Sequence, residues 1–188
     1  MSGAVVIGVS GGIGKALEEA LIEEGAFDTV YGFARSESDD RHLDLEDEAS
    51  IAAAALRVGS PALVAKHFLP TMPKAGRIVF AVLSARVGSI GDNKLGGWYG
   101  YRASKAALNQ LVKTISIEDK RRNSSGIVVG LHPGTVDTGL SKPFQGNVTP
   151  GNLFKPDRAA VQLLDVIDGL RAPDSGKLFA WDGVEVTP

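Results

Sequence analysis

The chain has 188 residues, of which 44% are hydrophobic and 22% are charged, and its formal net charge is -2. These values are typical of a globular protein and predict a single domain over residues 1–188. A net charge so close to zero provides no basic surface for a nucleic-acid backbone, and no apolar run reaches the roughly 18 residues of a membrane span. We therefore expect neither nucleic acid nor a membrane as a partner.

The absence of Cys excludes disulfides, thiolate catalysis and Cys-ligated zinc. The first residues also lack the basic start and long apolar stretch of a signal peptide, so we expect a cytoplasmic protein. None of the scattered histidines, His42, His67 and His132, has a partner at ligand-like spacing, and we predict no metal site.

Short apolar runs alternate with amphipathic stretches along the chain. The runs are rich in Val and Ile, as in strands buried on both faces, and the stretches between them repeat apolar residues every three or four positions, as in helices. Gly25 marks a helix end and Asp157 a helix N-cap. This order predicts an α/β fold with a doubly wound parallel sheet, of Rossmann type, that binds ligands at the carboxyl ends of its strands. The predicted strands are 4–9, 29–33, 42–45, 77–83, 127–131 and 177–181, and the predicted helices are 13–24, 46–58, 101–119 and 158–170.

A glycine-rich turn follows the first predicted strand and opens the first helix. Its sequence is Gly8-Val9-Ser10-Gly11-Gly12-Ile13-Gly14. Small residues allow the backbone to approach a pyrophosphate, and the helix N-terminus offers unpaired N–H groups and the positive end of a dipole. Such turns also occur for structural reasons, so this motif alone does not decide between the two interpretations.

A second motif, YRASK, opens the long helix in the second half of the chain. Its spacing of four places Tyr101 and Lys105 on one helical face. Positive charge from Lys105 and from an oxidised nicotinamide favours the phenolate, so we expect the pKa of Tyr101 to fall toward neutrality. The alternative is an ordinary helix with a partly buried Tyr and an exposed Lys.

Three motifs in this order, GVSGGIG, YRASKAALN and HPGTVDT, resemble the short-chain dehydrogenase/reductase family, and the stretch GSIGDNKLGGWYGYRASKAALNQL is similar to its branch of C-factor-like proteins and carbonyl reductases. The resemblance implies a nicotinamide cofactor, with Tyr101 as the catalytic acid/base and Lys105 as the residue that binds the nicotinamide ribose. Tyr101 is preferred to Tyr99 because only Tyr101 has Lys four residues on. The implied cofactor-binding residues are Gly8, Ser10, Gly11, Gly12, Ile13, Gly14, Tyr101, Lys105, Pro133, Gly134, Val136 and Thr138.

The family also has a Ser that polarises the substrate carbonyl, and here the match departs from the pattern. The usual position of this Ser is held by Ala85, and Ser84 occupies the preceding position. We assign Ser84 as the third catalytic residue. Ser89 is a less favoured substitute, and a strand-end cap is the alternative role of Ser84.

The residues after the second predicted strand bear on the choice of cofactor. An acidic residue there binds the ribose hydroxyls of NAD and repels a 2′-phosphate. This chain has Arg35, which can pair with a phosphate, and Ser36, which can donate a hydrogen bond, so we predict NADP over NAD. The alternative for Arg35 is a solvated loop residue. Asp44 resembles the family's Asp beside the adenine ring, but an acidic residue at a helix N-terminus is an equal interpretation.

Several apolar residues match regions that contact substrate in the family. Trp98 and Tyr99 line either a hydrophobic substrate pocket or the core, and Phe144, Leu153 and Phe154 fall in the region of the mobile lid. The resemblance implies a homodimer or homotetramer.

The family's fourth strand and much of the following helix have no counterpart near Gly59-Ser60. In the family order 3-2-1-4-5-6 this strand lies between the first and the fifth, so two inner strand edges would lose their partners. Either the sheet closes in a new way, or the sequence omits a segment; we favour omission.

The sequence thus predicts an NADP-dependent oxidoreductase that moves hydride between nicotinamide and a small-molecule carbonyl or secondary alcohol. The alternative is a non-catalytic nucleotide-binding signalling protein of C-factor type. A third interpretation, an inactive fragment, rests only on the missing segment.

Overall fold

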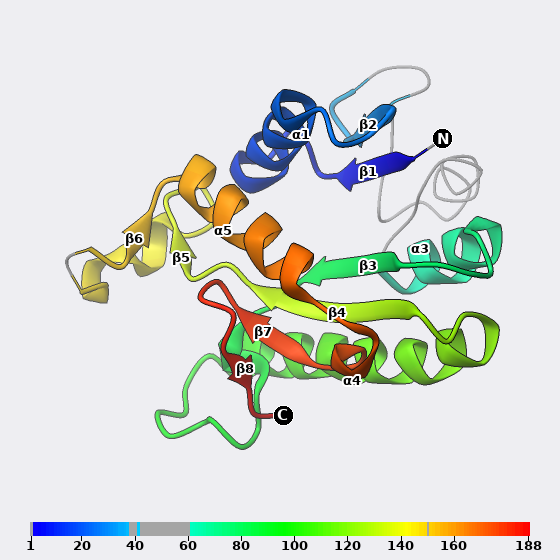
Figure 1. Ribbon diagram of the computed structural model, residues 1–188. Helices are drawn as coiled ribbons and strands as arrows, with labels where there is room; N and C mark the ends of the chain where they lie inside the picture. The colour runs from blue at the N-terminus through cyan, green and yellow to red at the C-terminus, as the bar shows by residue number, and fades with distance from the viewer. Residues whose placement is uncertain (1, 38–40, 42–60, 150) are drawn as a thin grey trace. The chain divides into compact units, whose positions relative to one another are not determined.

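The computed structural model describes residues 2–37, 41, 61–149 and 151–188 (Figure 1). The helices are α1 (Gly12–Glu24), α3 (Pro61–Phe68), α4 (Tyr99–Arg122) and α5 (Pro156–Gly169), and the strands are β1 (Gly3–Ile7), β2 (Thr29–Phe33), β3 (Ile78–Leu83), β4 (Gly126–His132), β5 (Thr135–Val136), β6 (Leu153–Phe154), β7 (Leu178–Ala180) and β8 (Glu185–Val186). Short 3-10 helices lie at Leu69–Thr71, Arg86–Gly88, Lys142–Asn147 and Ala172–Asp174.

These elements confirm the predicted α/β class, with helices between mostly parallel strands. β1 pairs with β2, and β5 pairs with β6, both in parallel. The largest sheet has the order β3-β4-β7-β8, in which β8 alone is antiparallel to its neighbour. β4 is buried along almost its whole length, as its run of Val, Ile and Leu predicts for a central parallel strand.

The chain divides into two compact units, each made of two segments. Unit 1 comprises Met1–Thr71 and Thr135–Val161, and unit 2 comprises Met72–Gly134 and Gln162–Pro188. β1 and β2 belong to unit 1, and the sheet of β3, β4, β7 and β8 belongs to unit 2.

The strand pairing agrees with the predicted lack of a fourth strand. Within the described residues, β1 pairs only with β2, β3 pairs only with β4, and no strand joins the two sheets. The predicted strand 42–45, the predicted helix 46–58 and the Gly59-Ser60 junction lie outside the described residues.

Two helices begin two residues earlier than predicted, and α4 also ends three residues later, at Arg122. α4 begins at Tyr99 rather than at 101, because Trp98 turns the chain with a positive φ of 48° immediately before the helix. α5 begins at Pro156, so Asp157 lies in its first turn instead of at the N-cap. An acidic residue in a first turn still stabilises the positive end of the helix dipole. The C-terminal cap of α1 is confirmed, since Gly25 adopts a left-handed conformation with φ 64°.

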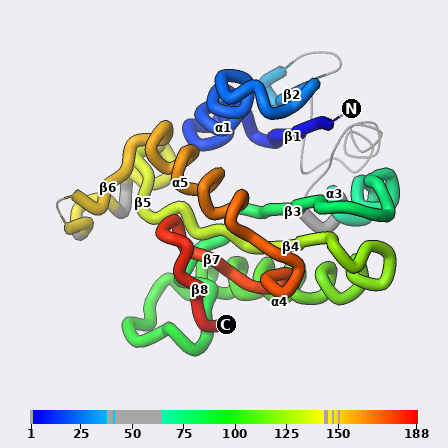
Figure 2. Tube along the Cα trace, in the orientation of Figure 1, coloured from blue at the N-terminus to red at the C-terminus, as the bar shows by residue number. Residues whose placement is uncertain are grey.

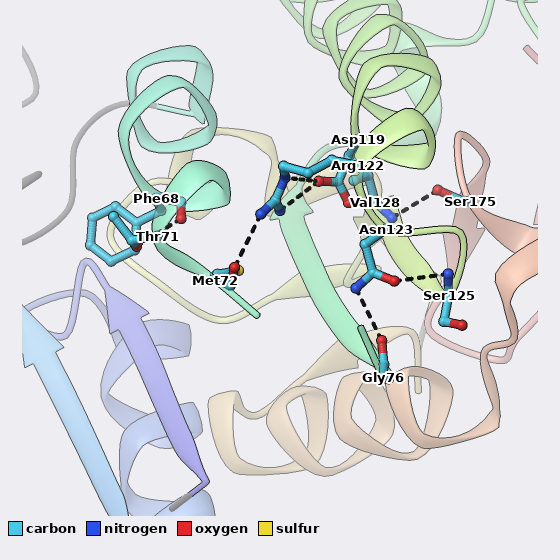
Figure 3. A network of polar contacts seen from close by, with 10 residues as sticks. All are labelled: Phe68, Thr71, Met72, Gly76, Asp119, Arg122, Asn123, Ser125, Val128 and Ser175. Carbon is cyan, nitrogen blue, oxygen red and sulfur yellow. Dashed lines mark hydrogen bonds and ion pairs between the residues drawn. The ribbon is translucent and has the colours of Figure 1, made fainter. Parts of the chain in front are cut away.

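A buried polar network fixes the end of α4 (Figure 3). The Arg122 guanidinium donates to the Asp119 carboxylate at 2.7 and 3.1 Å and to the Met72 carbonyl at 3.1 Å. Asn123, which follows the helix, donates to the Gly76 carbonyl at 3.1 Å and accepts the N–H of Ser125 at 3.0 Å. The network thereby joins the end of α4 to the residues that lead into β3. β3 and β4 are parallel, and α4, which connects them in the chain, runs in the opposite direction. The start of α4 therefore lies at the carboxyl ends of both strands (Figure 1).

Candidate functional site

The glycine-rich turn of unit 1 lies at the carboxyl ends of β1 and β2. The N–H of Gly8 donates to the Phe33 carbonyl at 2.7 Å, and the N–H of Gly11 donates to the Gly8 carbonyl at 2.9 Å. Gly8 has a φ of 90°, which favours glycine, and a Cβ on Gly14 would overlap the backbone of Gly8. The turn thus requires glycine at both positions.

The N-terminus of α1 is open to a ligand in this turn. Its N-cap residue, Gly11, makes no side-chain capping hydrogen bond, and Ser10, Gly11 and Gly12 are exposed. A Cβ on Gly12 would lie 3.0 Å from the Thr138 methyl group, so the structure brings these two predicted cofactor-binding residues together. Uncapped N–H groups beside a backbone without side chains form a cradle that fits a pyrophosphate.

The two residues predicted to select NADP lie at the same edge of this small sheet. Arg35 and Ser36 follow β2 and are exposed, and the register pairs Ile7 with Phe33, directly before both loops. Arg35 therefore lies at the same sheet edge as Gly8. Asp44 lies outside the described residues.

Thr135 and Val136 form β5, whose parallel partner is β6. The hydroxyl of Ser141 donates to the Val136 carbonyl at 2.5 Å and accepts the N–H of Thr138 at 3.2 Å, which fixes the turn after β5. Phe154 in β6 is buried, and the Arg158 guanidinium lies 4.2 Å from its ring centre. Phe154 is therefore a core residue of unit 1.

In unit 2, Tyr101 and Lys105 lie on one face of α4, as predicted. The Lys105 ammonium lies 6.0 Å from the centre of the Tyr101 ring and donates to the Leu83 carbonyl at 3.1 Å. This hydrogen bond connects α4 to the last residue of β3. Gly88 makes the approach close, since a Cβ there would lie 2.6 Å from the carbonyl carbon of Lys105.

Burial shifts both of these groups toward their neutral forms. It raises the pKa of the Tyr101 phenol and lowers the pKa of the Lys105 ammonium. The expected lowering of the Tyr101 pKa therefore does not follow from Lys105 alone.

Ser84 lies at the end of β3 with its side chain turned to α4. Its hydroxyl is buried and lies 2.5 Å from the Asn109 side-chain oxygen, to which it donates. Ala85, in the position of the family's catalytic Ser, is also buried and has an extended backbone with φ -152°. Ser89 is buried too, and its hydroxyl donates to the Thr187 carbonyl. Both hydroxyls near Ala85 are thus already engaged within the protein.

Pro133 and Gly134 follow β4, and Gly134 has a φ of 75° that favours glycine. His132 directly before them is largely buried, and its Nδ1 has no hydrogen-bond partner. Burial, reinforced by the charge of Arg86 and opposed by that of Asp182, lowers the pKa of His132 to about 4. His132 is therefore neutral at pH 7, in keeping with the structural role predicted for it.

The loop from Ser89 to Trp98, called the 89–98 loop below, precedes α4. Its large apolar side chains are solvent-exposed: Ile90 is 81% and Leu95 is 90% exposed, and Trp98 at the helix start is 54% exposed. Trp98 is therefore not a core residue. Large apolar side chains exposed on one loop are typical of a ligand-binding surface.

The sequence did not single out two residues that hold this region together. Asn109 binds Ser84, and Arg102 donates to three carbonyls of the 89–98 loop and the turn before it. Arg102 lies inside the YRASK motif, and Asn109 lies one turn beyond Lys105. Only their positions relative to this motif could have indicated from the sequence that they support the site.

No helix in the described part of the chain is long and apolar enough to cross a membrane. The same residues hold no group of three or more His, Asp or Glu side chains that could bind a metal ion.

The fold and these motifs define a class of protein that is identified by similarity to known proteins. A sequence model of the short chain dehydrogenase family matches residues 32–148, more than half of the chain. The chain therefore belongs to the short-chain dehydrogenase/reductase family, a family of NAD(P)-dependent oxidoreductases, and the predicted resemblance is confirmed.

Among individual proteins, C-signal of Myxococcus xanthus is 36% identical over 126 residues, which cover 67% of this chain and 70% of that protein. The 1-hydroxy-2-glutathionyl-2-methyl-3-butene dehydrogenase of Rhodococcus sp. (strain AD45) is 38% identical over 102 residues, covering 54% of this chain and 43% of that protein. This chain thus spans less than half the length of the second relative.

The structure is similar to the crystal structure of NADPH-bound carbonyl reductase from chicken fatty liver. The TM-score is 0.82 at 23% identity, over 100% of this chain and 94% of that chain. This similarity confirms the Rossmann-like fold.

Proposed function

We propose that the protein is an NADP-dependent oxidoreductase that reduces a carbonyl compound or oxidises a secondary alcohol. The observation that carries the proposal is the pairing of Tyr101 with Lys105 at the carboxyl ends of β3 and β4, where Lys105 also binds the Leu83 carbonyl. A half-exposed phenol at this edge can exchange a proton with a substrate oxygen.

The glycine turn supplies the complementary part of the proposal. The uncapped N-terminus of α1 follows a turn in which Gly8 has a positive φ and Gly14 has no room for a side chain, and this backbone fits a pyrophosphate. We propose that Arg35 and Ser36 bind the 2′-phosphate, and that Pro133, Gly134, Val136 and Thr138 surround the nicotinamide. When bound, the cofactor would supply or accept the hydride.

In this proposal the residues of the chain move protons and orient the substrate. Tyr101 gives its proton to the substrate oxygen during reduction and takes one during oxidation. Lys105 contributes positive charge beside the phenol and binds the ribose. Ser84 is the proposed group for the carbonyl oxygen, although its hydroxyl would first have to leave Asn109. A cytoplasmic location, a single domain and a homodimer or homotetramer stay predictions.

The direct test is Tyr101→Phe, which removes the acidic proton and keeps the ring. We expect reduction of a panel of carbonyl compounds by NADPH to slow by at least about 1000-fold, within the range of general acid–base catalysis. NADPH binding should change little. The matched control is Tyr99→Phe, because Tyr99 is 87% exposed and has Ala103 four residues on. Equal turnover in the two variants would refute the proposed role of Tyr101.

The cofactor preference is tested by Arg35→Ala. Loss of a charged hydrogen bond should weaken NADPH binding by at least about tenfold and leave NADH binding nearly unchanged. NADH is thus the internal control. A parallel loss for both cofactors would mean that Arg35 does not select the 2′-phosphate.

A second candidate function, a nucleotide-binding protein without catalysis, is favoured by one observation. Ala85 occupies the catalytic Ser position, and the neighbouring hydroxyl of Ser84 is buried against α4. Two variants separate the candidates. If the wild type is an active reductase that uses Ser84, Ser84→Ala should lower turnover strongly. If the site lacks its hydroxyl, only Ala85→Ser should create or raise turnover.

A further inference from the structure

The Arg102 side chain is directed into the 89–98 loop and not toward an acidic partner residue. Its Nε donates to the carbonyls of Gly96 at 3.1 Å and Gly97 at 3.0 Å, and its Nη1 donates to the Val87 carbonyl at 3.1 Å. The guanidinium also lies 5.9 Å from the centre of the Trp98 ring. One side chain therefore connects the end of the loop and its aromatic residue to the turn that precedes the loop.

The backbone at these contacts is in an unusual conformation. Gly96 and Gly97 have φ values of 64° and 70°, and Trp98 is the only described residue other than Gly with a positive φ, at 48°. Three consecutive residues in the left-handed region are rare, and they orient their carbonyls differently from residues with negative φ. An external donor that bonds these carbonyls stabilises the conformation, and Arg102 is that donor.

The loop has a second attachment, at the C-terminal residues of the chain. The N–H of Gly91 donates to the Pro188 carbonyl at 2.9 Å, and the hydroxyl of Ser89 donates to the Thr187 carbonyl. Figure 2 shows these C-terminal residues, in red, beside the green segment that holds the loop. The loop is thus anchored near its start by Thr187 and Pro188 and at its end by Arg102.

The loop that these anchors hold carries exposed apolar side chains, and its last residue, Trp98, directly precedes α4, three positions before Tyr101. Ile90, Leu95 and Trp98 are exposed on it, and a cavity of about 200 Å³ lies between the loop and α4. Ile90, Ala103 and Ala106 line this cavity together with Arg102 itself. Because Arg102 follows Tyr101 directly in α4, any shift of the loop relative to Arg102 is also a shift relative to the phenol.

We propose that Arg102 is a positioning residue that holds the 89–98 loop beside Tyr101, so that the loop binds the apolar part of a hydrophobic carbonyl substrate. This inference rests on the proposed reductase function. Arg102 takes no part in proton or hydride transfer. Its Nε and Nη1 reach the three carbonyls from two separate nitrogens of one planar group, whereas Lys has a single nitrogen at the end of a flexible chain, so Arg102→Lys should be deleterious although it keeps the charge.

The experiment compares Arg102→Lys with Arg121→Lys, an exposed arginine at the other end of α4. Both are made in a Trp181→Phe background, so that Trp98 is the only fluorescent tryptophan. We expect Arg102→Lys to raise KM for apolar carbonyl compounds by at least about tenfold while kcat changes by less than about threefold. NADPH affinity should be unchanged, and acrylamide should quench Trp98 more strongly in the absence of substrate. Arg121→Lys should match the background protein in all four measurements.

Several results would overturn the inference. One is an unchanged KM in Arg102→Lys, and another is a raised KM with unchanged quenching, which would mean that Arg102 contacts the substrate directly. A loss of NADPH binding parallel to the loss of substrate binding would indicate general damage. If the background protein reduces no carbonyl compound, the proposed function fails, and the quenching of Trp98 alone decides whether Arg102 positions the loop.

A second variant covers the case in which Arg102→Lys does not fold. Gly96→Ala leaves α4 intact, and the side chain would meet no atom within 4 Å, but it disfavours the positive φ that presents the carbonyl to Arg102. We expect it to raise KM and Trp98 quenching in the same direction. Wild-type values of both in this variant would contradict the inference.

Discussion

The two ends of unit 2 use charged residues in different ways. At the amino ends of its strands, Asp119 and Arg122 form a pair whose side chains are 3% and 21% exposed. At the carboxyl ends, Arg86 and Asp92 form a pair that is 49% and 44% exposed, and Arg102 binds carbonyls instead of an acid. The first arrangement stabilises the join between α4 and β3, whereas the second leaves an ion pair accessible to solvent.

This contrast has a physical basis. A buried pair gives stability only while both partners are present, because a lone buried charge is expensive. An exposed pair contributes little to stability but leaves its groups free to rearrange around a ligand. The amino end therefore suits a fixed anchor and the carboxyl end a binding site.

The largest expected effect comes from breaking the buried pair. Arg122→Met leaves the Asp119 carboxylate buried without its partner and removes the bond to Met72, so we expect about 3–5 kcal/mol less stability in urea unfolding. The control Arg121→Met, at an exposed neighbouring position, should change stability by less than about 0.5 kcal/mol. A similar small change in both variants would show that the network is not an anchor.

A smaller effect is expected where the 3-10 helix Arg86–Gly88 approaches the start of α4. Gly88→Ala places a Cβ 2.6 Å from the carbonyl carbon of Lys105, and both are backbone-bound atoms that cannot move apart cheaply. We expect up to about 3 kcal/mol less stability and a loss of turnover, since Lys105 must move. Urea unfolding and NADPH oxidation measure the two effects. Unchanged turnover would mean that this contact does not position Lys105.

The strands and helices of this chain were predictable where the signal is local. The Val-rich runs of β1, β3 and β4 and the periodic apolar residues of α1 and α5 specify their elements directly. β5, β6 and β8 have two residues each and exist only because a partner strand lies beside them. The early start of α4 also escaped, because it depends on Trp98 and on Arg102, which stabilises the turn across space.

The site residues, too, were predictable where the signal is local. Tyr101, Lys105 and the glycines are recognised by spacing within one short segment. The Ser84–Asn109 contact joins residues 25 positions apart and was therefore not visible in the sequence. The sequence thus indicated the candidate site residues Tyr101 and Lys105, but not Asn109 and Arg102, whose hydrogen bonds fix the neighbouring segments.

Protonation of His132 should lower the free energy of unfolding at acidic pH. Its pKa is about 4 in the folded protein, mainly because of burial, and about 6.5 when unfolded, so the unfolded state binds the extra proton between these values. Stability therefore falls as pH falls from 6.5, by about 2 kcal/mol at pH 5. We expect His132→Gln to flatten the pH dependence by this amount in urea unfolding at several pH values. His67→Gln is the control, and parallel curves for wild type and His132→Gln would contradict the prediction.

The smallest expected effect is a gain in stability. Gly100 lies in the first turn of α4, and a Cβ there would meet no atom within 4 Å. Gly100→Ala should therefore stabilise the protein by about 0.5–1 kcal/mol, because alanine loses less conformational freedom in a helix. Thermal unfolding measures the gain. A loss of stability would contradict the open space that the structure shows around Gly100.

The alternation of the two compact units along the chain also limits how the protein can be divided. Unit 1 takes its last segment from Thr135–Val161, and unit 2 takes its last segment from Gln162–Pro188. No single cut releases either unit intact, so expressing one half of the gene would give an incomplete version of both. During synthesis, neither unit has all of its residues until the ribosome has passed position 161.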